Sequence, residues 1–115
     1  MEPWPTDASH QTTRIDLGKN TQKEDWFLEI NPNGRIPALT DTFTDGSPIR
    51  LFESGSILQY LIDRYDTEHK LSYPHGSKES YEVANWLFWQ MGGLGPMQGQ
   101  SNHFTRQSSL AREGK

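Results

Sequence analysis

The sequence predicts a small α/β domain in which a β-hairpin is followed by helices. One sign is the Asp45-Gly46 pair, which lies between two short apolar segments and tolerates the positive φ angles of a tight turn. The other sign is a change of period. After residue 53 the apolar residues recur at intervals of three and four, as on one face of a helix. With 115 residues, the chain has the length of one small domain.

Three segments have the residue pattern of β-strands. Residues 12–17 alternate between polar and apolar side chains, which is typical of a short strand with one buried face. Residues 36–40 and 48–52 flank the Asp45-Gly46 turn, so residues 36–52 are expected to form an antiparallel hairpin. Between the first two strands, Trp26, Phe27 and Ile30 form an apolar anchor on a short helical turn that ends at Asn31-Pro32.

Two longer helices are predicted after the hairpin. They cover residues 54–65 and 79–91, and residues 92–96 (Gly-Gly-Leu-Gly-Pro) are expected to break or bend the second one. Residues 1–9 are interpreted as a loose leader and residues 107–115 as a frayed tail. The two apolar stripes consist of Ile57, Leu58, Leu61, Ile62 and Tyr65, and of Ala84, Leu87, Phe88 and Met91.

The composition argues against several classes of function. The net charge of −4 does not suit a protein that binds nucleic acid, and no stretch approaches the ~20 apolar residues of a membrane span. The chain has no cysteine, which excludes disulfides and thiolate chemistry and fits a reducing compartment such as the cytoplasm. The four histidines show no zinc-like spacing, so no metal site is expected.

The Ile36-Pro37 bond has two interpretations. It can be a trans bond at the start of an edge strand, since Pro cannot donate to a ladder there. It can instead be a cis-proline turn, a form that only about 5–6% of X-Pro bonds adopt in folded proteins. In that case the N–H and C=O of Ile36 are free to pair with an incoming extended backbone.

Glu53-Ser54 also has two interpretations. Ser54 can simply cap the helix that begins there. Alternatively, the free N–H groups and positive dipole of the helix N-terminus can bind a ligand carboxylate, together with the Ser54 hydroxyl. Glu53 would then pair with an ammonium group. A ligand that carries both charges is the head of an α-amino acid.

Three motifs in order resemble the glutathione S-transferase superfamily. They are residues 30–39 (Ile-Asn-Pro-Asn-Gly-Arg-Ile-Pro-Ala-Leu), residues 51–61 around Glu53-Ser54, and residues 86–104, which run from Trp86 to Phe104. The third motif is similar to the nu class and its fungal relatives, which include a regulator of nitrogen catabolite repression. The resemblance implies a thioredoxin-like domain over residues 10–73 and the start of an all-α C-terminal domain over residues 74–115.

The resemblance also implies a ligand and a site. Glutathione is the expected substrate, with the Ile36 backbone on its cysteinyl unit beside cis-Pro37, and with Glu53 and Ser54 on its γ-glutamyl head. Gln22 matches a family position that also contacts glutathione. Arg35 matches a position whose side chain favours the glycyl carboxylate of glutathione. Family enzymes join glutathione to electrophiles, and the nu class reduces disulfides with it, in roles such as detoxification or fungal secondary metabolism. Family members are usually homodimers.

The resemblance leaves open whether the chain is an enzyme. The family has a strand and a helix ahead of the strand that matches residues 12–17, so the thioredoxin-like domain is expected to be incomplete, and the chain truncated at both ends. The residue that activates the glutathione thiol normally follows that first strand, so no catalytic residue is assigned. The alternative is an inactive binding or regulatory protein on the same fold, like the nitrogen regulator. A thioredoxin or glutaredoxin is excluded, because it needs a reactive cysteine.

Overall fold

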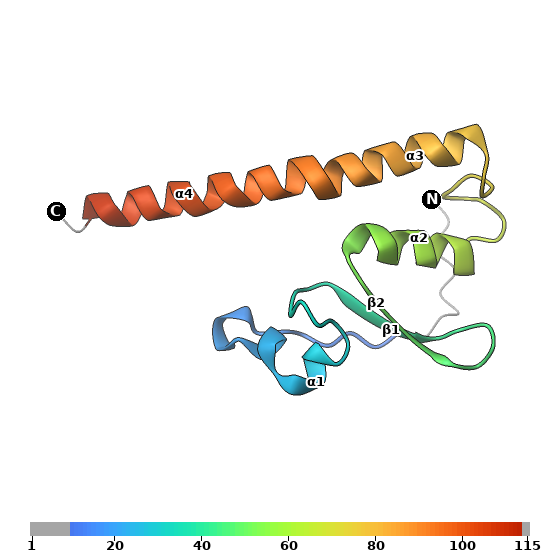
Figure 1. Ribbon diagram of the computed structural model, residues 1–115, viewed down its shortest axis with the longest axis horizontal. Coiled ribbons are helices and arrows are strands. Elements are labelled where there is room, and N and C mark those ends of the chain that lie inside the picture. Colours follow the sequence, from blue (N-terminus) through green and yellow to red (C-terminus); the bar gives the residue numbers. More distant parts are fainter. Residues whose placement is uncertain (1–9, 114–115) are drawn as a thin grey trace.

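A computed structural model describes residues 10–113, and for residues 109–113 only the backbone. The chain forms a two-stranded sheet, a helix packed on that sheet, and one long helical rod (Figure 1). The predicted leader, residues 1–9, lies outside the described residues. The elements are two 3₁₀ turns at Leu17–Lys19 and Thr21–Lys23, α1 (Asp25–Leu28), β1 (Ala38–Thr42), β2 (Pro48–Phe52), α2 (Ser54–Tyr65), α3 (Lys78–Trp89), a π-helical stretch (Gln90–Leu94) and α4 (Gly95–Glu113).

The predicted hairpin is confirmed. β1 and β2 pair antiparallel, with Ala38 opposite Phe52 at one end of the ladder and Thr42 opposite Pro48 at the other. Gly46 closes the turn with a φ of 84°, a left-handed conformation that favours glycine. β1 begins at Ala38 rather than at the predicted Ile36, because Pro37 has no N–H to donate to a ladder.

The predicted strand over residues 12–17 is not observed. Residues 10–16 have no regular secondary structure, and Leu17 begins a 3₁₀ turn. A strand needs a neighbour that satisfies its backbone N–H and C=O groups. Within the described part of the chain, β1 pairs with β2 alone. The alternation still has an effect, since Thr13 and Ile15 both line a hollow of about 330 Å³ beside α1 and β1.

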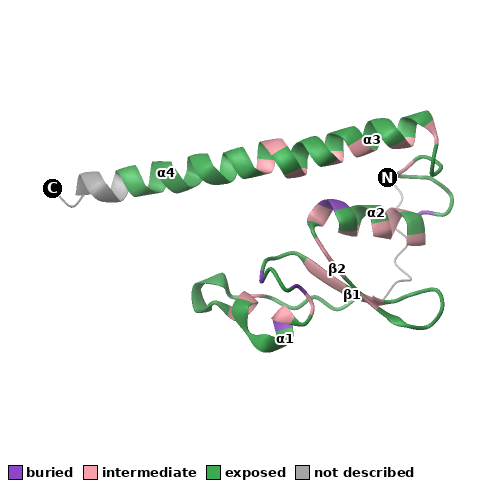
Figure 2. Cartoon of the chain, in the orientation of Figure 1, coloured by how far each residue is buried: buried purple, intermediate pink, exposed green. Residues whose placement is uncertain are grey.

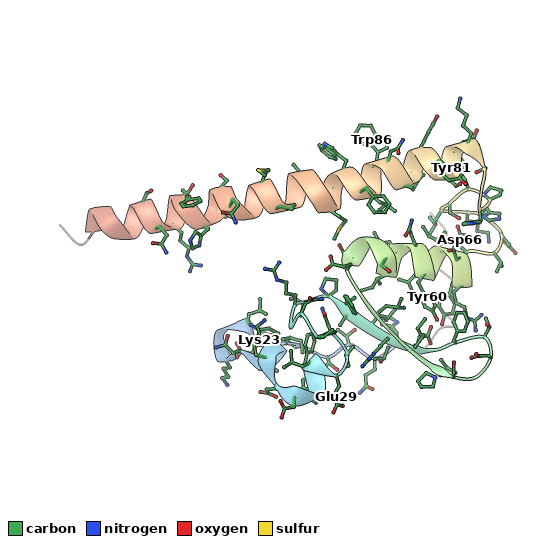
Figure 3. The ribbon with its side chains drawn as sticks, viewed as in Figure 1. Lys23, Glu29, Tyr60, Asp66, Tyr81 and Trp86 are labelled. Atoms are coloured by element: carbon green, nitrogen blue, oxygen red, sulfur yellow. The ribbon has the colours of Figure 1, made fainter. Side chains whose placement is uncertain are left out.

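Helix α2 packs on the hairpin through a carboxylate that two tyrosines share. The predicted limits of this helix, residues 54 and 65, are confirmed. Tyr60 points from α2 toward the sheet (Figure 3), and its hydroxyl donates to Asp41 Oδ2 at 2.7 Å. The hydroxyl of Tyr65 donates to the same oxygen at 2.5 Å. These two bonds fix α2 on β1, and they lower the pKa of Asp41.

The long helix differs from prediction at two places. α3 passes through the π-helical stretch directly into α4, so the glycines at 92, 93 and 95 do not end it. Pro96 is the second residue of α4, directly after the π-helical stretch. The predicted frayed tail is helical to Glu113. Its Leu-Ala-Arg-Glu residues are strong helix formers, and an existing helix extends more readily than a new one starts.

The fold has very little apolar core. Among the described residues, Phe27 is the one buried apolar side chain, at 3% exposure, and Figure 2 shows most of the ribbon exposed. The radius of gyration is 18.1 Å, whereas a compact domain of this length would have about 13 Å. The accessible surface of 9892 Å² also exceeds the roughly 6,400 Å² expected for this mass. Large apolar side chains on α3 are exposed, with Trp86 at 67% and Phe88 at 72%.

The faces of the rod are not equivalent. Trp86 lies on the side of α3 that faces away from α2 (Figure 3), where it meets Trp89 edge to face at 5.6 Å. Leu87 and Met91 lie on the side that faces α2 and line a small hollow with it. No helix in the described part of the chain is long and apolar enough to cross a membrane.

We expect the Asp41 cluster to make stability depend on pH. The folded pKa of Asp41 lies below its ordinary value of 3.8, chiefly because of the bonds from Tyr65 and Tyr60. The stabilisation is therefore fully present above the unfolded pKa and is lost as the pH falls through the lower folded pKa. Tyr60→Phe should reduce the free energy of unfolding by about 1 kcal/mol at pH 7, and by less near pH 3. Urea unfolding at both pH values tests this, and an equal loss at both would contradict it.

Candidate functional site

A cavity of about 550 Å³ lies between the loop before β1, the start of α2 and the long helix. Ligand sites commonly have volumes of about 300–1,000 Å³. The loop before β1 and the start of α2 form one wall, and the π-helical stretch with the first turns of α4 forms the other. The lining residues are Asn31, Arg35, Ile36, Pro37, Glu53, Ser54, Gln90, Met91, Gly95, Pro96, Gly99 and Gln100.

The Ile36-Pro37 bond is cis, as the resemblance implied, so the trans alternative is wrong. Ile36 lies just ahead of β1, and its side chain is 48% exposed. Among the described residues, neither its N–H nor its C=O makes a backbone hydrogen bond. The N–H and C=O of Ile36 therefore remain available to an extended chain in the cavity.

The junction between β2 and α2 consists of a single residue, Glu53. Its φ of 70° and ψ of 119° lie outside the regions that non-glycine residues commonly adopt. Such conformations cost about 1–3 kcal/mol and gather at functional sites. No side chain in the described part of the chain caps the first turn of α2. The free N–H groups of this turn and the Glu53 carboxylate therefore border the same cavity.

Ser54 does not cap the helix, so the simpler interpretation of this residue is wrong. Its hydroxyl donates instead to the thioether sulfur of Met91 at 3.0 Å. Met91 also lies against Gly55, which is buried, and a Cβ at Gly55 would come within 3.2 Å of Met91 Cγ. Glycine at this position thus lets the long helix approach the start of α2 closely.

The loop over residues 31–35 is held by its own polar groups. Asn31, which is 2% exposed, donates from Nδ2 to the carbonyl of Arg35 at 2.7 Å. Its Oδ1 accepts from the backbone N–H of Asn33 at 3.0 Å. Gly34 has a φ of 60° and lies against the backbone of Gln22. The loop therefore presents Arg35 and Ile36 to the cavity from a fixed frame.

Five of the six predicted site residues line this cavity, namely Arg35, Ile36, Pro37, Glu53 and Ser54. Gln22 does not. It lies in the second 3₁₀ turn, where its Nε2 contacts Asn20 Oδ1 at 3.5 Å. Its Oε1 is buried and has no hydrogen-bond partner among the described residues. The role of Gln22 in ligand binding therefore stays a prediction.

The wall contributed by the long helix was not predicted. Met91, Gly95 and Gly99 follow one another at intervals of four, and Pro96 and Gln100 do the same, so each set lies on one face. That spacing was visible in the sequence and is the signal that could have found this wall. It was hidden because residues 92–96 were expected to break or bend the helix.

Within residues 10–113, no three His, Asp or Glu side chains come together in a way that could hold a metal ion. The cavity is lined instead by backbone groups, amides, one carboxylate, one guanidinium and one hydroxyl. These groups suit a zwitterionic organic ligand with peptide-like hydrogen bonds.

Comparison with known proteins identifies the family. The family profile described as "Glutathione S-transferase, N-terminal domain" matches residues 6–64, about half of the chain. The chain belongs to the glutathione S-transferase family. The predicted fold class is thereby confirmed, namely a partial thioredoxin-like α/β unit followed by the start of the helical part of a glutathione transferase.

Three similar proteins show how far the likeness extends. The disulfide-bond oxidoreductase YfcG of Escherichia coli is 43% identical over 100 residues, which cover 85% of this chain and 45% of YfcG. A glutathione transferase homolog from Lodderomyces elongisporus, crystallised with two GSH per subunit, is 48% identical with a TM-score of 0.79, and the match covers 83% and 44% of the two chains. Ure2p in complex with glutathione is 33% identical with a TM-score of 0.72, covering 83% and 43%. The chain thus spans less than half the length of these relatives.

We expect Gly34 to be essential for the frame of this site. In Gly34→Ala the new Cβ would lie 2.8 Å from the backbone carbonyl of Gln22, and φ would remain positive. Gly46→Ala is the matched control, because Gly46 also has positive φ but has nothing within 4 Å of a Cβ. Urea unfolding should show a loss of about 1–2 kcal/mol for the control and clearly more for Gly34→Ala. Equal losses would show that the close contact at Gly34 does not matter.

Proposed function

We propose that this chain binds glutathione in the cavity between Ile36, Glu53 and the long helix, as part of a glutathione S-transferase. The observation that carries the proposal is the meeting of two features in one cavity. The Ile36 peptide is free to pair with an extended backbone, and the first turn of α2 is free of side-chain caps. Structures of the relatives from L. elongisporus and of Ure2p with glutathione support it.

Each part of the tripeptide has a chemically matched partner. The α-carboxylate of the γ-glutamyl head would accept from the Ser54 N–H and hydroxyl, where the helix dipole favours negative charge. The α-ammonium would pair with the Glu53 carboxylate. The cysteinyl backbone would pair with the Ile36 peptide beside cis-Pro37. The glycyl carboxylate would lie toward Arg35, and Gln22 would contact the ligand from its 3₁₀ turn.

The reaction we propose for the complete protein is the one that the family's name describes. The glutathione thiolate attacks an electrophilic carbon, forms a C–S bond and expels the leaving group, or it attacks a disulfide sulfur and releases a thiol. The protein must lower the pKa of the thiol for either step. We assign no catalytic residue here, because the cavity lining holds a single hydroxyl, Ser54, and that group is placed at the γ-glutamyl end.

A second candidate is a non-catalytic binding or regulatory protein built on the same fold. The absence of a second hydroxyl or a thiol from the described cavity lining favours it. The likeness to the structure of Ure2p in complex with glutathione fits either candidate.

The remaining partners follow the same proposal. An electrophilic small molecule would enter beside the thiol, and the exposed apolar side chains of α3 are suited to self-association as a homodimer. We also propose that residues 10–73 form the glutathione-binding unit and residues 74–115 the start of the helical unit, in a cytoplasmic protein.

We expect glutathione to raise the Tm of the 115-residue chain in a concentration-dependent way. A ligand that binds the folded state stabilises it by about 2.7 kcal/mol at one hundred times its Kd. Ser54→Ala should weaken binding about 10- to 100-fold, because it removes a hydrogen bond to a charged group. Ser56→Ala, an exposed serine in the same helix, is the control and should respond like the wild type. An equal response of both variants would refute the role of Ser54.

We expect the chain not to accelerate conjugation of glutathione to an electrophilic aryl halide. In the proposed pose, Arg35 and the first turn of α2 face the two carboxylates of glutathione, and no residue is assigned to the thiol, so most of the bound ligand should stay protonated near pH 7. Absorbance of the conjugate at fixed glutathione concentration measures the rate with and without protein. A rate well above the uncatalysed one would show that the chain does contain an activating group, and would favour the enzyme over the binding protein.

A further inference from the structure

Asn31 is the one cavity-lining polar side chain in the described part of the chain that is almost fully buried. Buried amides are nearly always hydrogen-bonded, so the partners of Asn31 indicate what it holds. Those partners belong to the short loop that leads to Ile36. Asn31 is not one of the six predicted binding residues. It can affect ligand binding through this loop without contacting the ligand.

We propose that Asn31 is a positioning residue that directs the Ile36 N–H toward the bound ligand. The inference rests on the proposed function. Asn31 Nδ2 donates to the carbonyl of Arg35 at 2.7 Å. That carbonyl and the Ile36 N–H belong to one planar peptide unit, so an interaction that fixes the C=O also fixes the direction of the N–H. In a trans peptide the two bonds point in opposite directions, so the N–H points away from the Asn31 amide.

The hydrogen bonds at Asn31 leave its amide a single orientation. Asn31 Oδ1 accepts from both the backbone N–H and the Nδ2 of Asn33, at 3.0 and 3.1 Å. If the amide were flipped, its NH₂ group would face these two donors and could not bond to them. The backbone N–H of Asn31 donates to the carbonyl of Phe27 at 2.9 Å. Phe27 is the buried apolar residue of the fold, so the frame that holds Arg35 is anchored in the core.

Loss of the Asn31 hydrogen bond should affect the cysteinyl unit of the ligand and not its γ-glutamyl head. The γ-glutamyl head would bind at Glu53 and Ser54, whereas the hydrogen bonds of the Asn31 side chain go to Asn33 and Arg35, so this end of the ligand should not sense Asn31. The cysteinyl backbone needs a correctly directed Ile36 peptide. A preorganised peptide avoids an ordering cost on binding, so loss of the Asn31 bond should weaken ligands that carry the cysteinyl unit.

The test compares glutathione with L-glutamine, which carries the γ-glutamyl head as an amide and lacks the cysteinyl unit. Asn31→Ser keeps a hydroxyl that can accept from the Asn33 N–H, but it is too short to reach the Arg35 carbonyl. We expect its Kd for glutathione to rise about tenfold by NMR titration, as for one lost hydrogen bond, with the Kd for glutamine unchanged.

Asp66→Ser is the matched control for lost stability. Asp66 is also buried, at 7% exposure, and its carboxylate accepts from the N–H groups of Lys70 and Leu71 in the loop after α2. This loop does not line the cavity. The control should lower the Tm but bind glutathione like the wild type well below that temperature.

The outcomes are distinct. Wild-type affinity for glutathione in Asn31→Ser would overturn the inference, and so would an equal loss of both ligands, which indicates general damage to the site. Failure of the wild type to bind glutathione would overturn the proposed function as well. If Asn31→Ser does not fold, hydrogen exchange measured on the wild-type protein tests the inference instead. Its Asn31 side-chain NH₂ should be protected from exchange before ligand is added, and the Ile36 amide should become protected only with glutathione; an unprotected Asn31 amide would overturn the inference.

Discussion

The site depends on the way β2 passes into α2 across one residue. Glu53 takes an unusual φ of 70°, which turns the chain from the end of the strand into the first turn of the helix. Because Phe52 pairs with Ala38, the register brings the start of α2 beside the Ile36-Pro37 bond. A one-residue slip of the hairpin would separate these two features. The energetic cost at Glu53 is offset by the hairpin ladder and by the tyrosines that bind α2 to Asp41.

Buried polar side chains with several hydrogen bonds take over much of the role that an apolar core has in larger domains. Phe27 is the one buried apolar side chain among residues 10–108, whose side chains are described, while Asn31 and Asp66 are buried and hydrogen-bonded to nearby backbone groups. Asn31 holds the loop before β1 and Asp66 holds the loop after α2, and neither residue buries much apolar surface. A fold of this kind is expected to have low global stability. Its local geometry can nevertheless be well defined where a side-chain amide or carboxylate has several partners.

The sequence predicted the hairpin and α2 because their signals are local. The Asp45-Gly46 turn and the apolar stripe from Ile57 to Tyr65 each specify one element without help from the rest of the chain. The strand over residues 12–17 failed for the opposite reason, since a strand forms only against a neighbour and alternation does not reveal whether one is present. The long helix was underestimated at residues 92–96, because glycine and proline commonly break or bend helices, whereas here a π-helical stretch over residues 90–94 leads directly into α4. The cis bond was expected from the resemblance, and so were the cavity-lining residues at 35–37 and 53–54, whereas Asn31 could not be found until its burial was known.

The contact between Ser54 and Met91 explains how the two walls of the cavity can act together. A thioether is a weak hydrogen-bond acceptor, so the Ser54 hydroxyl has a partner that a carboxylate readily replaces. The sulfur thus keeps the hydroxyl oriented at the cavity edge without competing strongly for it. A stronger acceptor at position 91 would hold the hydroxyl back, and a residue without any acceptor would leave it free to rotate. The close approach at Gly55 is what places the sulfur there, so the long helix contributes to the amino-acid end of the site as well as to its outer wall.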